Sequence, residues 1–71
     1  EGQMIYQRMT VIYTNWRGET RERIVEPIDG GLWWGVTQWH PTPQWFIKAI
    51  DVETDKVKDF ALMGFKEWRF Q

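Results

Sequence analysis

Three arginines near a predicted hairpin carry the clearest phosphate-binding chemistry in the chain. Arg21 and Arg23 alternate onto one face of an extended segment, and Arg17 lies in the turn before it. A guanidinium is a planar fork of donors that matches phosphate oxygens. The alternative is a solvated face whose arginines pair with neighbouring acidic residues, and such surface pairs stabilise little. The sequence leaves both interpretations open.

Six tryptophans are the second chemical resource of the chain. Trp33 and Trp34 are adjacent, so in an extended segment their rings point to opposite sides. A small domain cannot bury both, and Trp39 follows shortly after them. Exposed indoles serve as a stacking platform for bases, a cage for cations or a subunit interface. The interface is the preferred interpretation here, because it would also add buried area to a small chain.

Four further residues complete the candidate ligand contacts: Tyr13, His40, Trp45 and Lys48. Tyr13 either stacks on a ligand or packs inside the first hairpin. Trp45 begins a strand beside a proline-rich loop, so it either meets a ligand or fills the core. His40 precedes a proline in a loop, where a histidine bonded to backbone is the simpler interpretation.

The sequence offers little for catalysis, metals or cofactors. It has no cysteine and one histidine, which excludes disulfides, thiolate sites and multi-histidine sites. Asp51, Glu53 and Asp55 alternate like the start of a calcium loop, but the glycine and the closing glutamate are missing. No nucleophile lies at a recognisable spacing from a base. We therefore expect a binding protein, not an enzyme, with no cofactor and no metal.

Charge and hydropathy narrow the partner classes. The 71 residues carry a net charge of −1, so a generic polyanion binder is not expected. No apolar run approaches the roughly 20 residues needed to cross a bilayer. We expect a soluble cytoplasmic protein that does not contact membranes. Residues 1–8 are interpreted as an N-terminal extension or expression remnant, and residues 9–71 as one domain.

The pattern of apolar residues predicts strands and no substantial helix. In the first segment, Met9, Val11 and Tyr13 share one face. Pro27 cannot donate to a ladder, so the second strand must end there or lie on an edge. The expected strands are residues 9–15, 20–28, 32–39, 45–52 and 57–62. The stretch 45–52 is apolar on both faces for most of its length, which predicts a central strand covered on two sides.

Turns separate these predicted strands, and the number and length of the strands indicate the fold class. Asp29-Gly30-Gly31 reads as a turn and not as a phosphate loop. Residues 63–70 form either a helical turn or a short closing strand, with Gly64 favouring a break. Five short strands are too few for a useful sandwich, whereas curling one sheet removes its edges. We therefore predict an all-β, five-stranded antiparallel barrel of the small SH3-like or Sm-like kind.

Several segments together resemble the WYL domain, a family named for a Trp-Tyr-Leu triplet. The triplet appears here as Trp45-Phe46-Ile47, and Arg23 lies four residues before Pro27 as in the family pattern. The matching segments are Val11-Ile12-Tyr13, Arg17-Gly18-Glu19, residues 22–27, residues 45–51 and Phe60-Ala61-Leu62. The resemblance spans about residues 9–65 and implies a short, stand-alone WYL-like protein with an Sm-like barrel.

The resemblance also implies a function. Members of the family act as ligand sensors in bacterial transcription regulators, occur in phage-defence proteins, and some bind nucleotides or single-stranded nucleic acid. The two arginines of the family's final strand are absent here, where residues 60–65 read Phe-Ala-Leu-Met-Gly-Phe. The extra tryptophans between Pro27 and Trp45 favour stacking over ion pairing. We expect a module that binds a nucleotide or short single strand through stacking and arginine–phosphate contacts. The alternative is a homo-oligomer or protein-interaction module using the tryptophan-rich segment 32–46.

Overall fold

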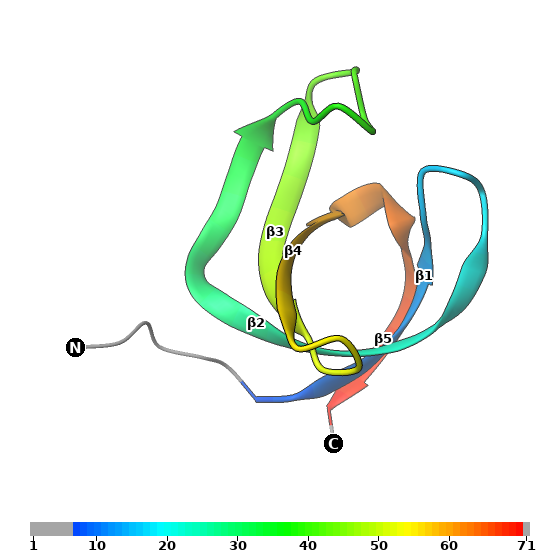
Figure 1. The fold of residues 1–71 in the computed structure, drawn as a ribbon, viewed down its shortest axis with the longest axis vertical. Coiled ribbons are helices and arrows are strands. Elements are labelled where there is room, and N and C mark those ends of the chain that lie inside the picture. Colours follow the sequence, from blue (N-terminus) through cyan, green and yellow to red (C-terminus); the bar gives the residue numbers. More distant parts are fainter. Residues whose placement is uncertain (1–6, 71) are drawn as a thin grey trace.

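The computed structural model describes residues 7–70, which form one antiparallel sheet of five strands (Figure 1). The all-β prediction is therefore confirmed, while most of the proposed N-terminal extension, residues 1–6, lies outside the described residues. The sheet order is β4-β3-β2-β1-β5. The elements are β1 Met9–Thr14, β2 Thr20–Gly35, β3 Gln44–Asp51, β4 Lys56–Ala61, a 3₁₀ helix η1 Leu62–Gly64, and β5 Phe65–Phe70.

Strand β2 joins two segments that the sequence separates. The expected break at Asp29-Gly30-Gly31 is an irregularity inside one 16-residue strand, where the pairing with β3 shifts between Pro27 and Leu32. The strand then ends at Gly35 and not at Trp39. Gly30 takes a φ of +75°, and a Cβ on Gly31 would lie 2.8 Å from the Lys48 carbonyl oxygen. Glycine at both positions therefore lets β2 bend without leaving the sheet.

Of the two outcomes predicted for Pro27, an end of the strand or an edge position, the second one holds. Pro27 pairs with Ala49 of β3, so the strand continues through it. On the other side of β2, the described pairing with β1 covers residues 20–25 and ends where Met9 lies opposite Val25. Among residues 7–70, β2 beyond Val25 therefore has β3 as its one hydrogen-bonded neighbour. A residue without an N–H is tolerated on such a local edge and next to a bulge.

The C-terminal residues combine the two structures predicted for them. The chain passes from β4 through the three residues of η1 directly into β5, which pairs with β1. Figure 1 shows the sheet curling so that η1 spans the side between its two end strands. Within residues 7–70, β4 and β5 remain the ends of the sheet order, so the predicted closure into a barrel is not confirmed. In that range η1 carries the chain across the open side, and no pairing joins β4 to β5.

The core lies on the inner face of the curled sheet. Val11 and Tyr13 of β1 are buried there, as their alternation predicts, and Met9 packs against them. The core cluster is Val11, Tyr13, Val25, Ala49 and Phe60. The rings of Tyr13 and Phe60 meet edge to face with centroids 5.0 Å apart, a favourable geometry for an aromatic pair.

Strand β3 is central in the sheet, as predicted, but only part of it is covered on both faces. Phe46 and Ala49 point to opposite faces and are both buried. Trp45 and Lys48 are exposed, so coverage on two sides is wrong at these positions. No helix among residues 7–70 has the length and apolar character needed to traverse a bilayer.

Candidate functional site

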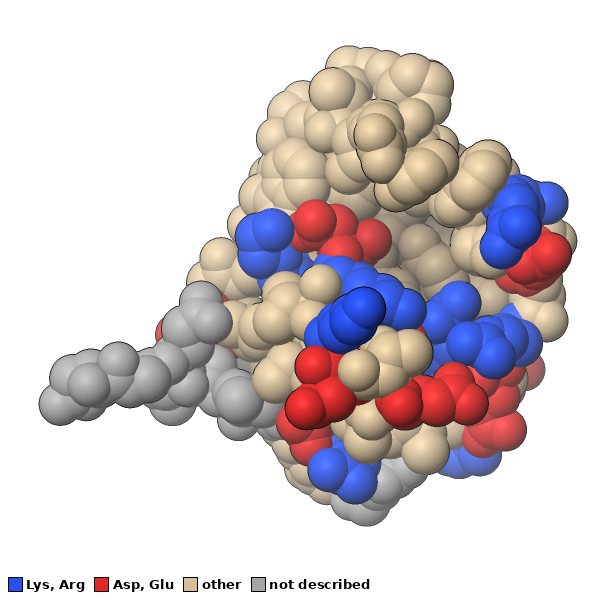
Figure 2. Space-filling model, viewed as in Figure 1, with Lys and Arg blue, Asp and Glu red and all other residues tan. Residues whose placement is uncertain are grey.

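A pocket lies where the turn between β1 and β2 approaches the loop between β2 and β3. Its volume is about 520 Å³, within the range of roughly 300–1,000 Å³ typical of small-molecule sites. The pocket is lined by Tyr13, Asn15, Trp16, Arg17, Arg23, Thr37, Gln38, Trp39, His40, Lys58, Asp59 and Phe60. Figure 2 shows a hollow below an uncharged upper region, with basic side chains beside it.

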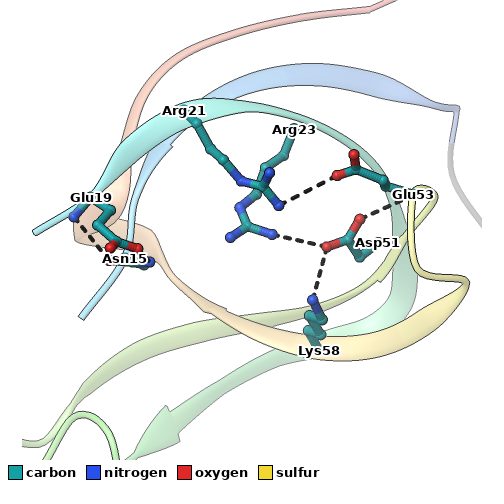
Figure 3. Close-up of polar contacts among 7 residues, drawn as sticks. All are labelled: Asn15, Glu19, Arg21, Arg23, Asp51, Glu53 and Lys58. Atoms are coloured by element: carbon teal, nitrogen blue, oxygen red, sulfur yellow. Dashed lines mark hydrogen bonds and ion pairs between the residues drawn. The ribbon is translucent and has the colours of Figure 1, made fainter. Parts of the chain in front are cut away.

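One wall of the pocket is a charged network centred on Asp51. Arg23 Nη1 donates to Asp51 Oδ2 at 2.9 Å, and Lys58 Nζ donates to the same oxygen at 3.0 Å. The backbone N–H of Glu53 donates to Oδ1 at 3.1 Å. Figure 3 shows the arginine reaching inward from β2 and the lysine approaching from β4. The network therefore ties Arg23 of β2 to the hairpin of β3 and β4, which carries Asp51 and Lys58.

Asp51 is fully buried, yet it stays ionised. Burial alone would raise the pKa of its carboxyl, but the hydrogen bond and charge of Lys58, the Glu53 N–H and the charge of Arg23 outweigh that effect. The pKa of Asp51 is consequently lowered from its ordinary value of 3.8. The carboxylate neutralises one of the two positive charges that face it, those of Arg23 and Lys58, so the network keeps a net positive charge.

Arg23 retains donor capacity on the wall of the pocket. Its side chain is 13% exposed, and both its hydrogen bond and its ion pair use Nη1. Within the described part of the chain, its buried Nε has no hydrogen-bond partner. A guanidinium carries five N–H donors, so Arg23 can hold Asp51 and still meet an acceptor from the pocket.

Tyr13 and Phe60 form the apolar floor. The Tyr13 hydroxyl accepts a hydrogen bond from the Ala61 N–H at 3.0 Å. Burial raises the pKa of Tyr13 above its ordinary value of 10.0, although the Ala61 contact and the charge of Arg23 act in the opposite direction. Tyr13 is therefore a neutral aromatic surface with its hydroxyl already engaged.

Two stacked indoles form the rim. Trp16 and Trp39 lie with centroids 5.0 Å apart and planes at 18°, and each is about half exposed. Arg17 lies over the Trp16 ring at 5.4 Å. The turn is held by Asn15, whose side-chain oxygen accepts from the Arg17 and Glu19 N–H groups. An aromatic platform and a cation are thus held together at the mouth of the pocket.

The loop between β2 and β3, on the other side of the pocket mouth, is folded around Thr37. Its hydroxyl accepts from the N–H groups of Trp39 and His40, and the His40 N–H also reaches the Thr37 carbonyl. The His40 ring lies edge to face with Phe46 at 5.5 Å. These contacts hold Trp39 in position against Trp16.

The structure brings five of the ten predicted ligand-binding residues into this pocket, and they come from both halves of the chain: Tyr13, Arg17, Arg23, Trp39 and His40. Arg21 lies next to the network and contacts Glu53 at 3.4 Å, with both side chains more than half exposed. It therefore follows the alternative interpretation, a solvated ion pair on a strand face.

The other four predicted residues lie outside the pocket. Trp33 stacks on Phe46 with centroids 4.7 Å apart, and its indole N–H donates to Asp59. Lys48 pairs with Asp59 and lies 5.6 Å from the Trp33 ring centroid. Trp34 and Trp45 pair with each other edge to face and remain about half exposed. The adjacent indoles Trp33 and Trp34 do point to opposite sides, as the sequence predicts.

Sequence reasoning missed the other seven lining residues of the pocket and Asp51 behind its wall. Trp16 was identifiable, because an indole in a predicted turn has little chance of burial and must make a surface contact. Lys58 alternates with Phe60 on one strand face, which is a weaker signal. The short turn between the predicted strands 45–52 and 57–62 brings Lys58 near Asp51, whereas nothing in the sequence indicates that Arg23 meets Asp51.

In residues 7–70 no group of three histidine, cysteine or acidic side chains is placed to hold a metal ion. Comparisons with protein-family models, curated proteins and solved structures find no match to this chain. The geometry of the pocket is therefore the basis for inferring a function.

Proposed function

We propose that this chain is a small ligand-binding module that recognises a nucleotide or a short single-stranded nucleic acid in the pocket between Trp16, Trp39 and Arg23. A base stacks on the indole pair at the rim, and a phosphate meets Arg23, Lys58 and Arg17. The single observation that carries this proposal is the placement of a paired indole surface beside a buried, net positive network.

The balance of charge supports a modest anion and not a long polyanion. Three basic side chains line the pocket against one acidic side chain, Asp59, which already pairs with Lys48. Asp51 compensates one further charge behind the wall. Because the chain as a whole is near neutral, binding depends on this local field and on stacking.

The proposal includes the resemblance to WYL domains and an SH3-like or Sm-like barrel that is partly open. Its support is the strand order, the single long strand β2 that bends across the sheet, and the 3₁₀ turn between β4 and β5. A sensing or sequestering role in the cytoplasm follows from that resemblance.

Titration of the protein with mononucleotides, cyclic dinucleotides and four-nucleotide single strands tests the proposal through tryptophan fluorescence and calorimetry. Stacking on Trp16 quenches its emission. Replacing Trp16 with alanine removes roughly 1–3 kcal/mol, which weakens binding by about 5- to 150-fold. Affinity falls between about 50 and 200 mM salt, because phosphate contacts release counterions.

Trp34→Ala is the matched control, since it removes an indole of similar exposure outside the pocket. It should leave the affinity unchanged. Inorganic phosphate alone and adenosine alone should each bind more weakly than the nucleotide. A flat response across the panel, or equal effects of Trp16→Ala and Trp34→Ala, would contradict the proposal.

A further inference from the structure

A second feature, separate from the pocket, is an exposed apolar surface formed by side chains of β2, β3, η1 and β5. Leu32 and Trp34 of β2 lie opposite Ile47 and Trp45 of β3, so these four side chains share one face. The apolar surface is defined here by Leu32, Trp34, Trp45, Ile47, Leu62 and Trp68.

The apolar surface contains a hollow as well as projecting side chains. Ile47, Leu62 and Trp68 line a hollow of about 110 Å³ whose other walls include Pro27 and Phe65. All of its lining residues are apolar. An apolar cavity of about 150 Å³ holds a benzene ring, so this hollow has room for part of one side chain. Next to it, Leu32 and Trp34 project with 54% and 56% of their surface exposed.

We propose that this apolar surface is the interface of a symmetric homodimer, in which Leu32 and Trp34 of each copy pack against the hollow of the other. A two-fold interface requires one surface that complements itself, and a projection beside a hollow of matching chemistry meets that requirement. The surface has no charged member, and a net charge of −1 gives little repulsion between copies. Figure 2 shows the region around the end of β2 and the start of β3 without charged side chains.

The exposed area also suits a dimer. Three tryptophans of the surface are 48–63% exposed, and Phe70 lies beyond Trp68 on the same edge with 63% exposed. At 150–250 Å² for each aromatic side chain, the three tryptophans expose roughly 250–400 Å², and Phe70 at the border of the apolar surface adds roughly 100–150 Å². The two leucines extend this area toward the lower range of stable interfaces, about 600 Å² per partner. A single copy of this size has no further element to cover the surface within residues 7–70.

Sedimentation velocity and light scattering of the full chain over about 1 µM to 1 mM test this proposal. The expected mass rises from 8.6 kDa to twice that value with concentration. Leu32→Ser and Trp34→Ser each raise the dimer dissociation constant by about tenfold or more, because each removes a central apolar contact. Circular dichroism checks that both variants stay folded, and having two variants protects the test if one does not.

Val57→Ser is the matched control. The exposed fraction of Val57, 56%, is similar to the 54% of Leu32, and Val57 lies on β4 outside the apolar surface. It should leave the dimer intact, and nucleotide binding should survive Leu32→Ser, which separates this proposal from the pocket. A mass of 8.6 kDa at every concentration would overturn the dimer, as would equal dissociation by Val57→Ser. A monomer that sediments with phosphatidylcholine vesicles would identify the occupant as lipid and also overturn it.

Discussion

Arg23 and Asp51 face each other across the inner side of the sheet with Nη1 and Oδ2 2.9 Å apart, and the carboxylate is almost completely buried. The two residues come from β2 and β3, and Lys58 of β4 meets the same oxygen. The pair therefore links the stability of the curled sheet to the charge of the pocket.

The first prediction concerns the loss of that carboxylate. Asp51→Asn leaves Arg23 and Lys58 facing each other without compensation, which should destabilise the fold by about 3 kcal/mol. This value is at the lower end for buried pairs, because the Lys58 side chain is 39% exposed. Urea unfolding measures the loss. Glu53→Gln, at a mostly exposed position, should cost less than about 0.5 kcal/mol. Similar losses in the two variants would contradict the prediction.

The second prediction is an acid-dependent loss of stability. The folded pKa of Asp51 lies below its ordinary value of 3.8, so the unfolded chain binds more protons in that range. The stability contributed by Asp51 is fully present above pH 3.8 and is lost as the pH falls through the lower, folded pKa. Urea midpoints of the wild type and Asp51→Asn should converge over this acid range. A difference that stays constant down to the lowest pH would rule the prediction out.

The third prediction concerns the shape of the Arg23 side chain. Arg23→Lys keeps the charge but loses the planar fork, so nucleotide binding should weaken by about tenfold or more. Calorimetric titration measures this change. Arg21→Lys is the control, since Arg21 is 54% exposed and lies outside the pocket. An unchanged affinity for Arg23→Lys would show that the guanidinium does not contact phosphate.

The fourth prediction concerns Tyr13. Tyr13→Phe removes the acceptor of the buried Ala61 N–H and should cost about 1–3 kcal/mol. Thermal unfolding measures the stability, and hydrogen exchange at Ala61 should become faster. Preserved protection at Ala61 would mean that its N–H finds another acceptor, contrary to the prediction.

The fifth prediction concerns the bend in β2. A Cβ at Gly31 would lie 2.8 Å from the Lys48 carbonyl oxygen and 2.9 Å from that of Ile28. Because both are backbone atoms, Gly31→Ala should destabilise the fold by roughly 1–3 kcal/mol and shift the amide signals of Lys48 and Ala49. At Gly18 a Cβ meets nothing within 4 Å, so Gly18→Ala should leave those signals in place. Unchanged signals in Gly31→Ala would contradict the close approach.

Local patterns in the sequence were sufficient to identify the strands and part of their facing. The alternation of Met9, Val11 and Tyr13 predicts that they share one face of β1, and the structure confirms this, because side chains alternate along any strand. Aromatic and β-branched residues likewise indicate an all-β chain. Five of the ten predicted site residues meet in one pocket, and Tyr13, Arg17, Trp39 and His40 do so because they lie in or next to the connections between neighbouring strands.

The tertiary structure decided the rest. Whether Pro27 ends a strand depends on which neighbour lies beside it, and β1 stops opposite Val25. The stacking of Trp16 on Trp39 depends on two loops meeting at one end of the sheet. The convergence of Arg23 and Lys58 on Asp51 depends on the pairing of β2, β3 and β4, which sets Asp51 opposite Val25 and Lys56. Alternation and turn chemistry are properties of neighbouring residues and are readable in sequence, whereas these contacts arise only when the strands pair in one register and the loops meet.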